Sequence, residues 1–76
     1  MKGLVELDTR GLNCPLPVLK AQKAMRAMAA GDRLRVLATD PKAPGDFAQF
    51  CEAAGHSLLE NTAHADHFAV VIEKRG

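Results

Sequence analysis

The chain has 76 residues, of which 47% are hydrophobic, so it is long enough for one small domain and too short for two. We therefore expect a single domain over residues 1–76. A formal net charge of +1 excludes the strongly basic surface that drives non-specific nucleic-acid binding. Two cysteines are too few for the disulfide framework of a small secreted protein, which favours a reducing, cytoplasmic location.

The first half of the chain predicts a strand, a helix and a second strand. Charged residues interrupt the N-terminal stretch, so we expect neither a signal peptide nor a membrane span there. Residues 4–8 read as a short strand, and residues 33–39 alternate between apolar and polar side chains as a half-buried strand does. Between them we predict a helix over residues 15–30, because apolar residues recur at spacings of three and four: Val18, Ala21, Met25 and Met28.

The second half predicts one more helix and a hairpin. Asp40-Pro41 and Pro44-Gly45 mark a turn and the lead-in to a helix that Gly55 ends, with an apolar stripe at helical spacing: Phe47, Phe50, Cys51 and Ala54. Residues 56–62 and 67–74 read as two strands joined by a short polar loop. The order βαβαββ predicts an α+β fold, a two-layer sandwich in which a mixed four-stranded sheet carries two helices on one face.

One cysteine, Cys14, stands where the first helix is expected to begin. Pro15 and Pro17 suit the first turn of a helix, whose N–H groups lack intrahelical acceptors, and a residue before proline favours the extended backbone of a capping position. We therefore expect the sulfur at the positive end of the helix, with its pKa lowered, more so if Arg10 or Lys20 approaches. This predicts an exposed, reactive Cys14, whereas the alternative is a small capping residue with no chemistry.

The motif Cys-Pro-Leu-Pro contains no second cysteine, so it lacks the resolving thiol of a dithiol oxidoreductase. This favours a group carried on one sulfur. A dithiol protein using Cys14 and Cys51 remains an alternative, although Cys51 falls on the apolar stripe of the second helix and is expected to be a buried core residue.

The segment LDTRGLNCPLPVLK, the later Gly31, the Asp40-Pro41 turn and the stretch from Phe50-Cys51 to Gly55-His56 together resemble TusA-like (SirA-like) sulfurtransferases over nearly the whole chain. The resemblance implies a βαβαββ sandwich in which Cys14 carries sulfur as a persulfide and Pro15 and Pro17 are the motif prolines.

The resemblance also implies partners of two kinds. A sulfur donor, such as a cysteine desulfurase or a rhodanese-like protein, would load Cys14, and an acceptor protein in tRNA thiolation, sulfur oxidation or molybdenum-cofactor synthesis would receive the sulfur. Well-known tRNA-thiolation members carry an acidic residue where this chain has Leu16, which leaves the pathway open. We expect no cofactor and no metal.

Basic residues recur along the first predicted helix and could form a docking surface for an acidic partner, together with Arg10: Lys20, Lys23 and Arg26. The alternative is an ordinary solvated helix face. His64 and His67 flank a predicted hairpin tip and are expected to be turn residues rather than metal ligands, and His56 is assigned no chemistry.

The main rival is a non-catalytic RNA- or protein-binding regulatory module. The expected fold is similar to the C-terminal domain of a bacterial initiation factor, and Arg33 and Arg35 share one strand face. However, the three aromatic residues are all phenylalanines on predicted core faces, which leaves no stacking platform for single-stranded RNA.

Overall fold

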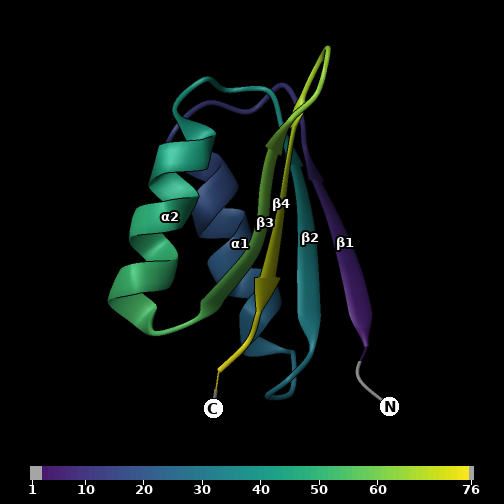
Figure 1. The fold of residues 1–76 in the computed structure, drawn as a ribbon, viewed down its shortest axis with the longest axis vertical. Helices are drawn as coiled ribbons and strands as arrows, with labels where there is room; N and C mark the ends of the chain where they lie inside the picture. The colour runs from purple at the N-terminus through teal and green to yellow at the C-terminus, as the bar shows by residue number, and fades with distance from the viewer. Residues whose placement is uncertain (1–2, 76) are drawn as a thin grey trace.

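The computed structural model describes residues 3–75 as one α/β sandwich (Figure 1). Six elements follow one another in the predicted order βαβαββ. They are β1 (Leu4–Thr9), α1 (Leu16–Arg26), β2 (Arg33–Ala38), α2 (Ala43–Ala54), β3 (Ser57–Ala63) and β4 (Phe68–Glu73). The predicted fold class is therefore confirmed.

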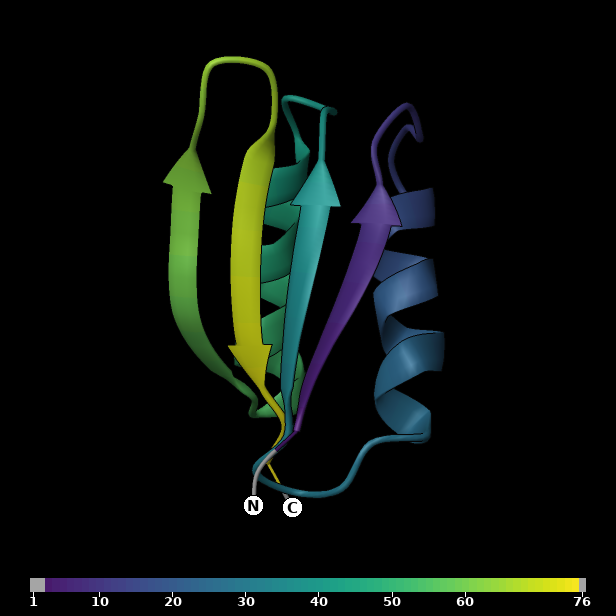
Figure 2. The same cartoon turned by 90° about the vertical axis from the view of Figure 1, so that its right-hand side faces the viewer.

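The four strands form one mixed sheet in the order β1-β2-β4-β3. The two strands that each precede a helix, β1 and β2, pair in parallel, whereas β4 pairs antiparallel with both β2 and β3. Both helices lie against one face of the sheet, and the other face is left uncovered (Figure 2).

The core lies between the sheet and the helices. Leu34, Val36 and Ala38 of β2 are fully buried on the helix side, while Arg33 and Arg35 point to the uncovered face. This is the alternation that the sequence predicts, because successive side chains of a strand point to opposite faces.

The helix α1 is shorter than predicted, since it ends at Arg26 rather than near residue 30. The apolar periodicity continues to Met28, which is buried although it lies beyond the helix. The Lys74 ammonium donates hydrogen bonds of 2.6 Å to the carbonyl oxygens of Met25 and Met28. A side chain from the far end of the sequence thus satisfies the carbonyls that a longer helix would have used.

The helix α2 buries Phe47 and Cys51 and ends where predicted, at Gly55, whose φ of 79° is the left-handed conformation common after a helix. Because β1 and β2 are parallel and adjacent, the loops that follow them reach the same end of the sheet (Figure 2). The chain from β1 to α1, which contains Cys14, therefore lies beside the chain from β2 to α2.

Candidate functional site

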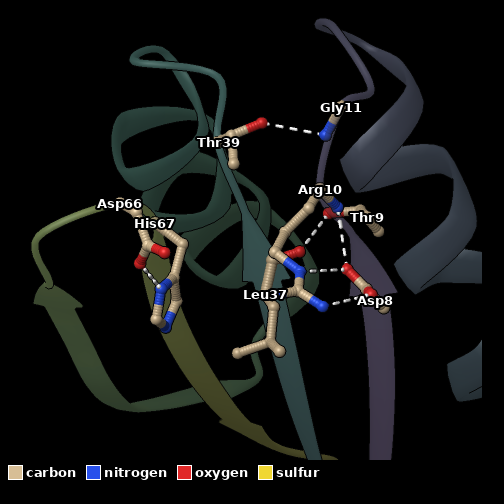
Figure 3. A network of polar contacts seen from close by, with 8 residues as sticks. All are labelled: Asp8, Thr9, Arg10, Gly11, Leu37, Thr39, Asp66 and His67. Atoms are coloured by element: carbon tan, nitrogen blue, oxygen red, sulfur yellow. Dashed lines mark hydrogen bonds and ion pairs between the residues drawn. The ribbon is translucent and has the colours of Figure 1, made fainter.

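The loop that carries Cys14 is fastened to the end of β2. Gly11, with a φ of 84°, turns the chain after β1, and its N–H donates a hydrogen bond of 2.9 Å to Thr39 Oγ1 (Figure 3). Just before this turn, the fully buried Thr9 donates its hydroxyl to the carbonyl oxygen of Leu37 at 2.6 Å. These contacts fix the direction in which the chain leaves the sheet.

Asp40 joins the two loops at their closest approach. Its Oδ2 accepts the N–H of Cys14, and its Oδ1 accepts the N–H of Lys42 at 3.0 Å. Both hydrogen bonds favour the ionised carboxylate and lower the pKa of Asp40. One carboxylate, 26 residues further along the chain, therefore holds the backbone of Cys14 in place.

The structure corrects the predicted position of Cys14 relative to the helix. Pro15, not Cys14, occupies the N-cap position of α1, and the Cys14–Pro15 peptide bond is cis. The N–H of Leu16 donates to the carbonyl oxygen of Asn13 at 2.9 Å, so it does not serve the sulfur as we expected. Cys14 lies in the loop just before the helix and is exposed.

The side chain of Cys14 lines an open groove of about 400 Å³ between α1 and α2. Apolar side chains from both helices line part of it, including Val18 and Phe50, and glutamines contribute neutral polar groups. Asp46, from the first turn of α2, lines the same groove as the sulfur. A negative charge is favourable in the first turn of a helix because of the helix dipole.

The predicted lowering of the thiol pKa is wrong: the surroundings of Cys14 raise it above its ordinary value. The main cause is a hydrogen bond between the thiol and the Asp46 carboxylate, followed by partial desolvation and by the negative charges of Asp46 and Asp40. Lys42 opposes these effects and lowers the thiol pKa. The resting sulfur is therefore held as a thiol beside two carboxylates.

Neither of the cations expected to activate Cys14 does so. Arg10 turns away along the uncovered face and forms a two-pronged ion pair with Asp8, with both N–O distances at 2.9 Å (Figure 3). Lys20 is exposed on α1 and is not one of the main causes of the shift in the Cys14 pKa.

The outer face of α1 is exposed and combines apolar and basic side chains. Leu16 and Leu19, near the Cys14 end, are 46% and 50% exposed. The predicted basic residues follow along the same helix, and all are exposed: Lys20, Lys23 and Arg26. The opposite side of the helix is buried, with Ala21 and Met25 in the core.

The three histidines contact neighbouring residues of the fold. His67 Nδ1 lies 2.7 Å from Asp66 Oδ1, and the His67 ring stacks on that of His64. Residues 3–75 contain no group of three metal-ligating side chains. The Nδ1 atom of His56 accepts the N–H of Arg75 at 3.1 Å. Within the same residues, no helix is both long and apolar enough to cross a membrane.

Cys51 is only 2% exposed, so its predicted place in the core is confirmed. Arg33 and Arg35, the basis of the RNA-binding alternative, lie on the uncovered face beside acidic partners. Arg33 approaches Glu73 at 3.4 Å, and Arg35 approaches Glu6 at 4.0 Å. Each of these arginines thus has a carboxylate close by that offsets part of its positive charge.

Sequence reasoning missed the two residues that define the surroundings of Cys14. Asp40 was interpreted only as part of a turn, and Asp46 was not singled out. The predicted topology did contain a signal, because parallel β1 and β2 place both helix starts at one end of the sheet. An acidic residue in the first turn of the second helix was therefore a candidate neighbour of Cys14.

Comparison with known proteins identifies the family. Residues 5–74 match the family model described as Sulfurtransferase TusA. A "Putative sulfur carrier protein" of Neisseria meningitidis serogroup A is 49% identical over 69 residues, covering 91% of this chain and 93% of the relative. The sulfur carrier protein TusA of Allochromatium vinosum is 45% identical over 69 residues, covering 91% of each chain.

The fold also matches a solved structure. The crystal structure of a SirA-like protein from Desulfitobacterium hafniense aligns with a TM-score of 0.81 and 24% identity, covering 95% of this chain and 99% of that one. At this identity the likeness concerns the fold alone. The family model and the sequence relatives decide the assignment, and the chain belongs to the TusA family of sulfur carriers.

Proposed function

We propose that this protein carries sulfur as a persulfide on Cys14, accepting it from a donor protein and passing it to an acceptor protein. Membership of the TusA family supports the sulfur-carrying role. The observation that carries the assignment to Cys14 is its position: it is the exposed cysteine of the chain, and it opens onto the groove between α1 and α2. The other cysteine, Cys51, is sealed in the core.

The surroundings of Cys14 suit sulfur relay between proteins. In the loading step, the Cys14 sulfur attacks the terminal sulfur of a donor persulfide, a new S–S bond forms, and the donor's own S–S bond breaks to release its thiol. Such an exchange requires an accessible sulfur on a well-ordered backbone. The hydrogen bonds that Asp40 and Thr39 accept from the loop hold its backbone in place, and the open groove leaves room for a partner's side chain.

The exposed outer face of α1 is the proposed docking surface for these partners. It places Leu16 and Leu19 next to the sulfur and basic residues further along the helix: Lys20, Lys23 and Arg26. A partner that fits this surface has an apolar contact close to its reactive sulfur and acidic side chains beyond it. Arg10 is left out of the surface because Asp8 holds it on the other side of the sheet.

The experiment that tests the function is intact-mass spectrometry of the protein after incubation with a cysteine desulfurase and cysteine. We expect the wild-type chain to gain the mass of one sulfur atom and to lose it on treatment with a reductant. Cys14→Ser should gain nothing. Cys51→Ala is the matched control, since it removes the other thiol and should load as the wild type does.

Two results would contradict the proposal. Sulfur found on Cys51 in the wild type would place the chemistry on the wrong cysteine. No gain of mass with either the desulfurase or a rhodanese supplied with thiosulfate would leave Cys14 without a carrier role.

A further inference from the structure

We propose that Asp46 is the proton acceptor of Cys14: its carboxylate takes the thiol proton as the sulfur attacks and passes it to the donor thiolate that leaves. This inference rests on the persulfide function proposed above. It gives Asp46 a part in the chemistry of Cys14.

The geometry favours Asp46 over the other carboxylate near the sulfur. Both oxygens of Asp40 already accept backbone N–H groups, one from Cys14 and one from Lys42. Asp46 lines the groove into which Cys14 opens, and within residues 3–75 it forms no ion pair with an arginine or a lysine. Asp46 is also the first cause of the raised pKa of the Cys14 thiol, so it is the carboxylate of this groove that is placed to accept a proton from that atom.

The charged groups with the largest effect on the sulfur come from the segment that follows β2. They are Asp40 and Lys42 in the loop and Asp46 at the start of α2. The other polar groups in the groove, Gln22 and Gln49, are neutral. A carboxylate beside the sulfur favours the protonated thiol, because two adjacent anions would repel each other.

The proposed step balances without an external oxidant or reductant. A donor persulfide, written R–S–S⁻, meets Cys14 as a thiol and Asp46 as a carboxylate. As the proton moves to Asp46, the Cys14 sulfur bonds to the terminal sulfur, and the donor S–S bond breaks with its electron pair on R–S. Asp46 then gives the proton to R–S. The products are the anionic persulfide of Cys14, the neutral thiol R–SH and the restored carboxylate.

Two reagents separate proton transfer from simple electrostatics. Alkylation by iodoacetamide releases iodide, which takes no proton, so its rate follows the amount of Cys14 thiolate alone. Glutathione persulfide releases a thiolate that does take a proton, and it needs no protein docking. Both rates are measured against pH for the wild type, Asp46→Asn and Glu52→Gln. Glu52 is exposed near the far end of α2 and is the matched control for loss of one negative charge.

We expect the two rates of Asp46→Asn to move in opposite directions. Without the carboxylate the thiol pKa falls, so alkylation at pH 7 becomes several-fold faster and its midpoint moves to lower pH. Sulfur uptake should become slower, by roughly tenfold or more, since general acid–base assistance is lost. The defect should shrink at alkaline pH, where solvent removes the proton and the leaving thiolate needs none. Glu52→Gln should match the wild type in both assays.

The outcomes distinguish this inference from the proposed function. If both rates of Asp46→Asn increase together, Asp46 only suppresses the thiolate, and the proton transfer is refuted. If neither rate changes, the contact with the sulfur has no consequence, and the inference fails while the carrier function stands. If the wild-type chain itself takes up no sulfur, the carrier function fails and the proton transfer fails with it.

Discussion

The reactivity of Cys14 is governed by side chains that are distant in the sequence. Its own segment, with two prolines where a helix begins, predicts a lowered thiol pKa. In the fold the thiol pKa is raised instead, because Asp46, partial desolvation and Asp40 all favour the protonated sulfur. A carrier with such a thiol reacts slowly with stray electrophiles and oxidants, which attack the thiolate form.

Asp8 allows a quantitative test at the scale of one residue. The side-chain hydrogen bond from Arg10 lowers the pKa of Asp8 from 3.8 to about 2, assisted by the backbone N–H of the same residue. Because the folded pKa lies below the ordinary one, this interaction stabilises the fold above pH 3.8 and is lost as the pH falls toward 2. In Arg10→Ala we expect the pKa of Asp8, measured by NMR titration of its carboxyl group, to rise. It should still stay below 3.8, since the backbone N–H of residue 10 remains.

Asp32 is the internal control in the same spectra. Its pKa is lowered mainly by hydrogen bonds from the backbone N–H groups of Gly3 and Ala29, which Arg10 does not touch. Its midpoint should therefore be unchanged in Arg10→Ala. An Asp8 midpoint that stays near 2 in the variant would show that the guanidinium is not the cause.

At the scale of elements, α2 contributes to the site at one end and to the fold at the other. Its first turn supplies Asp46, and its last residues are followed by Gly55 in a left-handed conformation, which lets the chain reverse into β3. The N–H of Gly55 and that of His56 both donate to the carbonyl oxygen of Cys51. This end of the helix is therefore closed within the molecule, and the strand that follows starts in a fixed place.

We predict that Gly55→Ala destabilises the fold by about 1 kcal/mol, since a residue with a Cβ atom is strained at positive φ. For a domain of this size, such a loss lowers the midpoint of thermal unfolding by ~4–8 °C. Circular dichroism during heating measures it. Gly45→Ala, in the first turn of the same helix, is the matched control: an added Cβ meets no atom within 4 Å, and the backbone has no positive φ. Equal losses in the two variants would exclude backbone strain as the cause.

At the scale of the whole molecule, the two layers present different charge patterns. The uncovered face of the sheet pairs its arginines with acidic side chains, as with Arg33 and Glu73. The outer face of α1 instead exposes lysines for which the structure shows no ion pair among residues 3–75. We therefore expect an acidic partner to be attracted to the outer face of α1 rather than to the sheet.

Loss of charge on the helical layer should slow loading by a protein donor. We expect Lys20→Gln combined with Lys23→Gln to lower the rate of sulfur transfer from a cysteine desulfurase by up to roughly tenfold at low salt, because electrostatic steering is reduced. The difference should disappear at high salt as the charges are screened. The rate is measured by quenching the transfer reaction at several times and salt concentrations and determining the sulfur-loaded fraction from the intact mass.

The matched control removes the same charge from the other layer. Arg33→Gln combined with Arg35→Gln loses two positive charges on the uncovered sheet face and should leave the transfer rate close to that of the wild type. Equal slowing by both pairs would mean that net charge, not the α1 surface, sets the rate. The small donor glutathione persulfide should load the wild type and both double variants equally.

The sequence by itself determined the elements of this protein and their order. Alternation along β2 and the helical stripe of Phe47 and Cys51 are local patterns, so they can be recognised without knowledge of the residues they pack against. Gly55 likewise indicates the end of α2, because glycine adopts the left-handed conformation without strain. The candidate sulfur was also found in this way, since the motif Cys-Pro-Leu-Pro is contiguous.

Only the tertiary structure decided where the first helix ends and how its cysteine behaves. Lys74 satisfies the carbonyl oxygens at the end of α1, and Asp40 and Asp46 lie beside Cys14 at the end of the parallel strands. Each contact joins segments that are far apart in the sequence, so no local sequence pattern predicts it. Electrostatic effects act through space over a few ångströms, so the pKa of the thiol is decided by the nearest charges of the folded chain rather than by its neighbours in sequence.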